Sequence, residues 1–241
     1  MIERLTLILD VFEDRTTRLT LKEVGFRTQL PRATVYRILN QLIRLNWVDH
    51  GPWGYGLGSR ALRFGGAGCV EIRAAAAPVL NELHMQTGMV VHLAVLDGGD
   101  SIYLDKVGGR FASMLPSQVG GRGPAYSTAG GKSMLAWLDP DIVDRFYEER
   151  LSRCTDRTIA DITTLHQELA RIRGRRGLAF ERGESERGVA CVGAAIRDHD
   201  APVAGISLCG AAGSAQLERF APLVAHAARE VSGTLYPEVG W

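Results

Sequence analysis

The chain lacks most features that define the simplest classes of protein. Its four cysteines are widely spaced over 241 residues and form no CxxC pair, which argues against a disulfide-stapled secreted domain. No stretch approaches the roughly 20 apolar residues of a membrane span. The apolar run near the N-terminus is bracketed by Glu3 and Asp10 and is followed by no small-residue cleavage site, so it does not resemble a signal peptide. We therefore expect a cytoplasmic protein without a membrane partner.

Catalytic and metal-binding motifs are also missing. The six histidines are scattered, and none has the spacing of a metal-ligand motif. TAGGKS ends like a phosphate loop, but Tyr126 stands where that loop needs glycine. GESERG is similar to a nucleophile elbow, but Arg187 replaces its second glycine. We expect no catalytic residue, no cofactor and no metal; a zinc site of His92, Cys191 and Cys209 has no supporting motif.

The net charge of +1 conceals an uneven distribution. Residues 1–65 contain 10 Lys and Arg against 6 Asp and Glu, whereas residues 66–241 contain 18 against 21. We call residues 1–65 the head and residues 66–241 the body. A basic head suits a polyphosphate partner such as a nucleic acid, because each neutralised phosphate releases counterions. With 46% hydrophobic residues, the chain is long enough for two globular domains.

The segment LPRATVYRILNQL, residues 30–42, predicts an amphipathic helix. Apolar residues recur at the helical spacing i, i+3, i+4 and i+7. Pro31 suits a first helical position, where its missing N–H costs nothing. The outward side chains are of types that contact bases and phosphates in a major groove. An ordinary surface helix has the same pattern, so the neighbouring segments decide between the two interpretations.

Those neighbours favour a helix-turn-helix. Residues 2–12 form a short amphipathic pattern, and Thr20 with Glu23 is a capping box that opens a second helix ending near Thr28. Gln29 stands in the following turn, where glycine is common. Leu5, Leu9, Leu21, Val24, Val35, Ile38 and Leu42 are expected to form the core.

Residues 47–57 predict a β-hairpin that would make the motif winged. A short strand at 47–50 and a second at 55–57 flank the turn residues GPWG. Trp53 at the tip would touch DNA or pack on the helix beneath it. The residues expected to contact DNA are Thr20, Arg32, Ala33, Thr34, Tyr36, Arg37, Asn40 and Trp53.

The body alternates apolar strand patterns with helical ones, which predicts an α+β sandwich. Strands are expected at 89–97, 101–107, 111–119, 189–198 and 202–210, and helices at 73–88, 128–138, 141–151, 161–174 and 214–235.

In this arrangement the chain resembles the isocitrate lyase regulator (IclR) family of bacterial transcription factors. The resemblance covers nearly the whole chain, with the motifs in family order. They are LPRATVYRIL, YGLG, VGGRGPAYSTAGGKSMLAWL, LSRCTDRTI, ESERGVACVGAAI and PVAGISLCG. The family usually has Ser at the position of Ala33 and Gly at or near Gln29, so the resemblance is weaker for the details of operator contact.

The resemblance implies three parts. They are a winged helix-turn-helix domain at 1–58, a linker helix at 59–73 and a GAF-like effector-binding domain at 74–241. The effector of relatives is typically a small organic or aromatic acid. The residues implied to bind it are Ala129, Gly130, Glu181, Glu184, Val189, Cys191, Ser207 and Cys209.

The residues support parts of that pocket independently. Val189 with Cys191, and Ser207 with Cys209, are each two apart, so each pair lies on one face of its strand. Ala129 and Gly130 would offer backbone N–H groups at a helix start. The alternative is that both cysteines are plain small core residues.

The expected function is a sequence-specific DNA-binding regulator controlled by a small-molecule effector. It would bind a double-stranded operator as a homo-oligomer, either a dimer or a tetramer, because paired half-sites require symmetry. The alternative is a DNA-binding head fused to a catalytic or purely oligomerising domain. The sequence leaves open whether it represses or activates.

Overall fold

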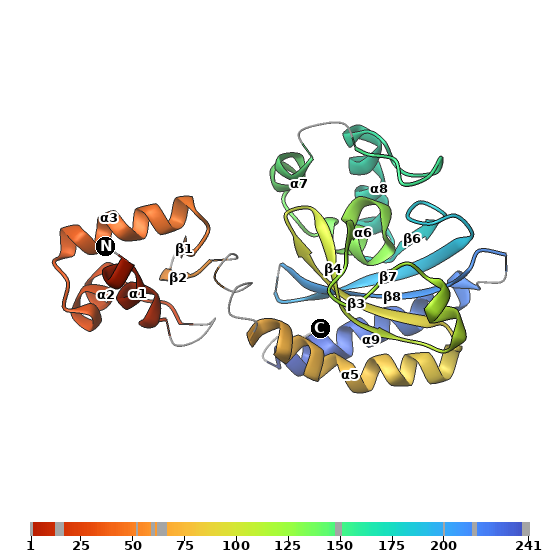
Figure 1. Cartoon of the computed structure of the whole chain (residues 1–241), viewed down its shortest axis with the longest axis horizontal. Coiled ribbons are helices and arrows are strands. Elements are labelled where there is room, and N and C mark those ends of the chain that lie inside the picture. The colour runs from red at the N-terminus through yellow and green to blue at the C-terminus, as the bar shows by residue number, and fades with distance from the viewer. Residues whose placement is uncertain are drawn as a thin grey trace. The chain divides into compact units, whose positions relative to one another are not determined.

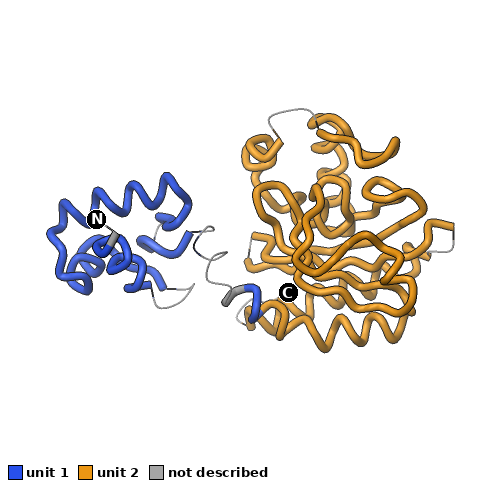
Figure 2. The backbone as a smooth tube through the Cα atoms, in the orientation of Figure 1, with its two compact units in different colours: residues 1–71 blue, residues 72–241 orange. Residues whose placement is uncertain are grey.

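The computed structural model describes residues 2–12, 17–51, 53–58, 61, 67–147, 151–199, 201–213 and 216–237. They divide into two compact units, residues 1–71 (unit 1) and 72–241 (unit 2), shown in Figure 2. Each unit has its own hydrophobic core, and each is described by itself.

Unit 1 is a winged helix-turn-helix, as the sequence predicts. Three helices precede a two-stranded antiparallel hairpin (Figure 1). The elements are α1 (Ile2–Asp10), α2 (Leu21–Thr28), α3 (Arg32–Arg44), β1 (Val48–Gly51) and β2 (Gly54–Leu57).

The turn between α2 and α3 forms without glycine. Gln29 adopts the left-handed conformation with φ 55° and ends α2, while its side-chain amide donates to the Phe26 carbonyl over 2.6 Å. Pro31 is the N-cap of α3 and not its first helical residue, which corrects the prediction. The capping box is confirmed: the Glu23 N–H donates to Thr20 Oγ1, and the Thr20 N–H donates to the Glu23 carboxylate.

The core of unit 1 differs from the predicted one in α1. Ile8 is fully buried, whereas Leu5 and Leu9 pack only partly buried against the cluster, as does Leu21. The short helix therefore turns Ile8 toward its neighbours. The buried cluster comprises Ile8, Phe12, Leu19, Val24, Val35, Ile38, Leu39, Leu42, Val48 and Tyr55.

Unit 2 contains a six-stranded sheet in the order β5-β4-β3-β8-β7-β6, and every neighbouring pair is antiparallel. The predicted α+β class is confirmed. The strands are β3 (Val90–Asp97), β4 (Asp100–Val107), β5 (Arg122–Pro124), β6 (Ala179–Arg182), β7 (Val189–Arg197) and β8 (Pro202–Ala211).

The helices of unit 2 differ from the predicted ones mainly at their ends. The strand expected at 111–119 is wrong: this segment begins within a 3-10 helix, η1, and the third strand of unit 2 is the short β5. Ser214, the predicted cap of the last helix, lies outside the described residues. The helical elements are α5 (Ala67–Thr87), η1 (Arg110–Met114), η2 (Ala125–Ser127), α6 (Ala129–Leu135), α7 (Pro140–Phe146), α8 (Ile162–Gly174) and α9 (Leu217–Leu235).

The predicted linker helix at 59–73 falls largely on residues outside the described ranges. From Ala67 the chain is helical, and α5 continues to Thr87 without a break at position 73. The boundary between the two units, at Glu71 and Ile72, lies within this helix.

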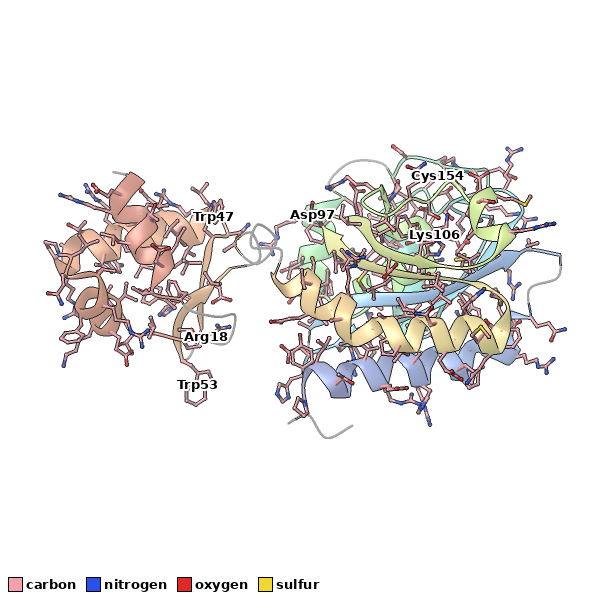
Figure 3. All side chains as sticks on the ribbon, turned by 60° about the horizontal axis from the view of Figure 1, so that its bottom comes forward. Arg18, Trp47, Trp53, Asp97, Lys106 and Cys154 are labelled. Atoms are coloured by element: carbon pink, nitrogen blue, oxygen red, sulfur yellow. The ribbon has the colours of Figure 1, made fainter. Side chains whose placement is uncertain are left out.

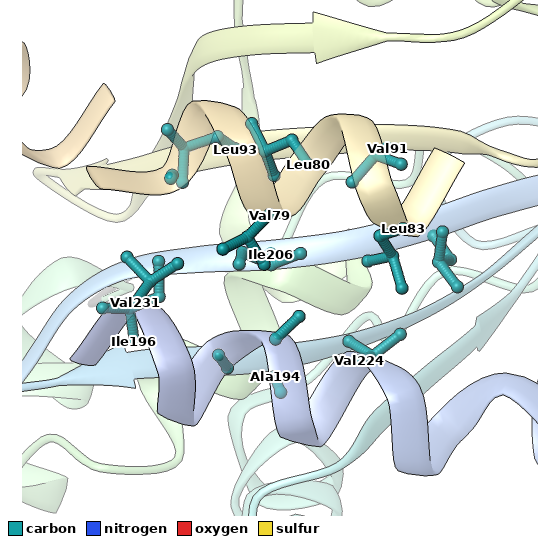
Figure 4. Close-up of a cluster of buried hydrophobic side chains, with 14 of the residues drawn as sticks. Val79, Leu80, Leu83, Val91, Leu93, Ala194, Ile196, Ile206, Val224 and Val231 are labelled. Carbon is teal, nitrogen blue, oxygen red and sulfur yellow. The ribbon is translucent and has the colours of Figure 1, made fainter. Parts of the chain in front are cut away.

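One face of the sheet is covered by α5 and α9 (Figures 1 and 4). Alternate residues of a strand share a face, so every second residue of β3, β7 and β8 packs against these helices. Each fully buried aliphatic side chain contributes about 2 kcal/mol relative to exposure in water. The sheet residues of this core are Val91, Leu93, Ala190, Val192, Ala194, Ile196, Ala204, Ile206 and Leu208.

The opposite face holds the short helix α6 against the sheet (Figure 1). Two glycines permit this close approach. A Cβ at Gly193 would lie 2.7 Å from the Ala129 carbonyl carbon, and one at Gly205 would lie 2.8 Å from the Gly130 oxygen. Other residues of β7 and β8 share this face of the sheet with the two glycines. The side chains of Val189, Cys191, Ser207 and Cys209 form one wall of a cavity there.

We expect Gly193→Ala to lower the free energy of unfolding of unit 2 by about 1–3 kcal/mol, because its methyl group would overlap backbone that cannot move without repacking. Thermal unfolding of the full chain measures the change. Gly213→Ala is the matched control, since nothing lies within 4 Å of its Cβ position. Equal stability of the two variants would refute the close-approach argument.

Candidate functional site

The outward face of α3 presents the side chains expected to enter a DNA groove. Val35, Ile38 and Leu42 are buried beneath it, so the helix is fixed in orientation. Tyr36 is 53% exposed even though it is aromatic. Of the predicted set, Arg32, Ala33, Tyr36 and Arg37 are exposed, and Thr34 and Asn40 are half-buried.

Thr20 lies exposed at the start of α2, with its hydroxyl engaged locally. Thr20 Oγ1 donates to the Glu23 carboxylate over 2.7 Å and accepts from the Glu23 N–H. The Thr20 N–H and the Thr20 hydroxyl both donate to the Glu23 carboxylate and lower the pKa of Glu23, since they favour its ionised form. The structure therefore assigns Thr20 a capping role, in addition to the DNA contact expected of it.

Trp53 projects from the tip of the wing, away from the rest of unit 1 (Figure 3). Its side chain is 82% exposed, so the alternative that it packs on the helix beneath is wrong. The wing is held instead through β2, where the Leu19 and Tyr55 backbones pair in both directions. An exposed indole at a wing tip is available to contact a partner.

In unit 2, a cavity of about 250 Å³ opens between the sheet and the segments around α6. Its lining combines apolar side chains with hydroxyl, thiol and imidazole groups. Six of the eight residues predicted to bind the effector line it, namely Ala129, Gly130, Val189, Cys191, Ser207 and Cys209.

The other two predicted residues do not line the cavity. Glu184 accepts hydrogen bonds of 2.7 Å at both carboxylate oxygens from Lys132, whose side chain is 1% exposed. Glu181 is also 1% exposed, and one of its oxygens accepts from the Glu184 N–H over 2.9 Å. Neither carboxylate lines the cavity, because Lys132 binds Glu184 and Glu181 is buried beside Cys191 of the paired strand β7.

Glu181 is electrostatically unusual. Its Oε1 has no hydrogen-bond partner among the described residues. Burial raises the pKa of Glu181 to about 7, although the Cys191 thiol and the Glu184 N–H oppose the increase. The group is therefore partly protonated near neutral pH.

The predicted effector-binding set omits several cavity residues, and His92, which the sequence suggested only as part of an unsupported zinc site, is the most informative. His92 alternates with Val91 and Leu93 in β3, so the period-two argument applied to Cys191 would also have found it. Its ring lies 5.1 Å from that of Tyr103. Ser117 comes from a segment without a regular period and offered no such signal.

His92 connects two parts of the cavity wall. The distance from His92 Nδ1 to Cys209 Sγ is 3.5 Å, and that from His92 Nε2 to Ser117 Oγ is 2.8 Å. The Lys106 ammonium donates to the Ser117 carbonyl over 2.6 Å, which fixes this loop. Burial lowers the pKa of Lys106.

Arg122 is the only lysine or arginine among the described residues that line the cavity. Its guanidinium is already paired, with Asp97 at 2.8 Å and Asp100 at 3.2 Å. A bound acid would thus compete with two carboxylates for this cation, or would use neutral donors of the wall.

Among the described residues, no group of three or more His, Cys, Asp or Glu side chains is arranged as metal ligands. Within the part of the chain that the structure describes, no helix is both long and apolar enough to cross a bilayer.

A winged helix-turn-helix followed by a unit with its own cavity is the arrangement of a two-domain transcriptional regulator. Family models agree: residues 1–52 match the IclR helix-turn-helix domain, and residues 67–233 match the bacterial transcriptional regulator IclR C-terminal domain. This chain belongs to the IclR family of transcriptional regulators, and its relatives XynR and IclR of Escherichia coli are named as regulators and not as enzymes.

Individual relatives give the same picture. The regulator XynR of Escherichia coli is 31% identical over 207 residues, which cover 84% of this chain and 82% of that protein. The crystal structure of Thermotoga maritima IclR matches with a TM-score of 0.66 and 29% identity, covering 97% of this chain and 98% of that one. An IclR homologue from Microbacterium hydrocarbonoxydans, complexed with 4-hydroxybenzoate, shares the fold with a TM-score of 0.66 at 22% identity, covering 98% of this chain and 99% of that one.

We expect Glu181→Gln to change the pH dependence of stability. The pKa of Glu181 is about 7 in the folded protein, above the ordinary glutamate value of 4.5, so the wild type loses stability as pH rises from 4.5 to 7. Glutamine keeps the volume and the acceptor but carries no charge. The variant should match the wild type near pH 4 and exceed it at pH 8 by up to about 3 kcal/mol.

Urea unfolding at the two pH values measures this difference, with the exposed Glu82→Gln as control. A difference that is independent of pH would show that Glu181 is ionised in the folded protein like an ordinary carboxylate.

Proposed function

We propose that the protein binds operator DNA sequence-specifically and that a small organic or aromatic acid in the unit 2 cavity controls this binding. The outward face of α3 supports the DNA-binding part of the proposal. This helix fits a major groove, and it exposes Arg32, Tyr36 and Arg37 above a buried core. The DNA partner itself follows from the family's helix-turn-helix domain.

Specific reading by one short helix requires a second copy. The charge excess of residues 1–65 is modest, so phosphate attraction alone gives weak binding. Two copies related by symmetry would place their α3 helices in successive major grooves about one helical turn apart. We therefore infer a homodimer or a homotetramer, acting in the cytoplasm where the DNA is.

The chemistry of the cavity supports a small acid as the effector. At about 250 Å³ the space lies at the small end of ligand pockets. Ala94, Leu115 and Val189 offer an apolar surface to a ring, while Ser101 and Thr128 offer hydroxyl groups to a polar substituent. The aromatic acid 4-hydroxybenzoate, which occupies a relative of the same fold, has both features and is a suitable first probe.

The ligand would control DNA binding if it bound one arrangement of the oligomer more tightly than another. A ligand shifts such an equilibrium only by the ratio of its affinities for the two states. The proposal therefore requires that occupancy of the cavity change operator affinity, which a purely oligomerising or catalytic unit 2 would not do.

Arg37→Ala should weaken operator binding by about 1–3 kcal/mol, or roughly tenfold to a hundredfold, and relax the preference at one base pair. Fluorescence anisotropy with DNA from the protein's own promoter region measures the change.

Arg229→Ala, an exposed arginine of α9, is the control and should leave binding unchanged. An Arg37→Ala variant that binds as tightly as the wild type at several salt concentrations would contradict the assignment of α3 to the groove.

Ser207→Leu should abolish ligand binding and leave operator binding intact, because the larger side chain enters the cavity from β8. Thermal-shift measurements over a panel of small carboxylates, including 4-hydroxybenzoate, test this. A ligand at a hundred times its Kd stabilises the wild type by about 2.7 kcal/mol.

The exposed Ser152→Leu is the matched control for added apolar volume. A ligand that shifts the unfolding temperatures of wild type and Ser207→Leu equally would bind somewhere other than this cavity.

A further inference from the structure

Three polar residues form a row across neighbouring strands on the cavity side of the sheet. Glu181 of β6 is paired with Cys191 of β7, and Cys191 is paired with Cys209 of β8. Cysteine is often buried, but a buried carboxyl group beside two thiols is unusual, because Glu is almost never fully buried unless it is paired. Neither the fold nor the DNA-binding proposal requires it.

The two cysteines occupy the kind of pair in which side chains approach most closely. The Ala212 N–H donates to the Gly188 carbonyl over 2.8 Å, and these residues continue the β7–β8 register. Hydrogen-bonded and non-hydrogen-bonded pairs alternate along an antiparallel ladder, so Cys191 and Cys209 form a non-hydrogen-bonded pair, with Cα atoms about 4.5 Å apart. That separation lies within the range that disulfides span.

Both thiols are free and line the cavity, and each residue is 5% exposed. A small neutral oxidant that enters the cavity would therefore reach either sulfur. Cys154 also lines the cavity but is exposed, whereas Cys69 is half-buried in α5.

The surroundings give the two sulfurs different roles. His92 Nδ1 lies 3.5 Å from Cys209 Sγ, and Ser207 Oγ lies 3.9 Å from the same sulfur. The Cys191 thiol and the His92 imidazole lower the pKa of Cys209, since both stabilise its thiolate. Burial and the adjacent Cys209 raise the pKa of Cys191. Cys209 is thus the nucleophile, and Cys191 remains a thiol beside Glu181.

We propose that Cys191 and Cys209 are a redox-active pair that hydrogen peroxide converts into a disulfide across the cavity wall. In the first step the Cys209 thiolate attacks one peroxide oxygen. The Cys209 proton passes to His92 Nδ1, an S–O bond forms and the O–O bond breaks, and the leaving hydroxide becomes water by taking that proton from His92. Sulfur is oxidised to a sulfenic acid and peroxide is reduced.

In the second step the Cys191 sulfur attacks the Cys209 sulfur. The S–S bond forms, the S–O bond breaks, and the leaving hydroxide departs as water with the proton of Cys191. The net change is two thiols and one peroxide to one disulfide and two waters. A dithiol reductant reverses it by exchange, which is typical of disulfides in reducing compartments.

The pair goes beyond the function proposed above, because it makes the cavity wall a modification site. A disulfide would replace two thiols that face the space open to the ligand, so oxidation and ligand binding would compete. The thiol chemistry can be measured without DNA, and its outcome is therefore separate from the outcome of the operator experiments.

The experiment treats the full-length chain with a small excess of hydrogen peroxide, followed by alkylation and peptide mass spectrometry without reductant. The variant C69S/C154S leaves only the pair under study. We expect a crosslink between the peptides of Cys191 and Cys209, its removal by dithiothreitol, and oxidation of Cys209 in the wild type at least tenfold faster than that of Cys154. If the wild type and C69S/C154S both consume peroxide but neither forms this crosslink, the proposal is overturned.

Matched variants separate the roles of the two sulfurs. C191S should accumulate a sulfenic acid on Cys209 that dimedone traps, whereas C209S should leave Cys191 unmodified. His92→Gln should slow the reaction at least tenfold and move its pH–rate profile upward, with the fold checked by circular dichroism. Modification of Cys191 in C209S at the rate seen for Cys209 would refute the assignment of the nucleophile.

Discussion

Unit 2 depends on the alternation of side chains along an antiparallel sheet. In β7 and β8 one set of residues is aliphatic and faces α5 and α9, while the other set is small or polar and faces α6 and the cavity. A slip of one residue in the pairing would exchange the two sets and place thiols in the core. The same register therefore closes the hydrophobic core and builds the wall of the site.

The approach of α6 sets the electrostatics of that wall. Gly193 and Gly205 let the helix backbone lie against the strands, so Lys132 becomes buried and requires a counter-charge. Glu184 supplies it, since an unpaired buried ammonium would be costly. The open side of the cavity is left with hydroxyl, thiol and imidazole groups, which suit recognition of a small polar ring and also give the two cysteines their reactivity.

The sequence predicted much of this and failed in identifiable places. The helical period of residues 30–42 and the Thr20 capping box gave the helix-turn-helix correctly, because both are local patterns. The strand expected at 111–119 is wrong because a short segment of apolar and small residues is ambiguous between strand and turn. The positions of Glu181 and Glu184 were misjudged because a charged side chain is expected to be exposed unless a partner is known.

The sequence by itself determined the two-part organisation, the family and the faces on which the cavity residues of β7 and β8 lie, because these follow from periodicity and ordered motifs. Only the tertiary structure decided which loops complete the cavity, that His92 meets Cys209, and that the partner of Lys132 is a residue 52 positions away. Such contacts depend on strand order and on the packing of α6, and no local pattern in the chain encodes a distance between residues so far apart.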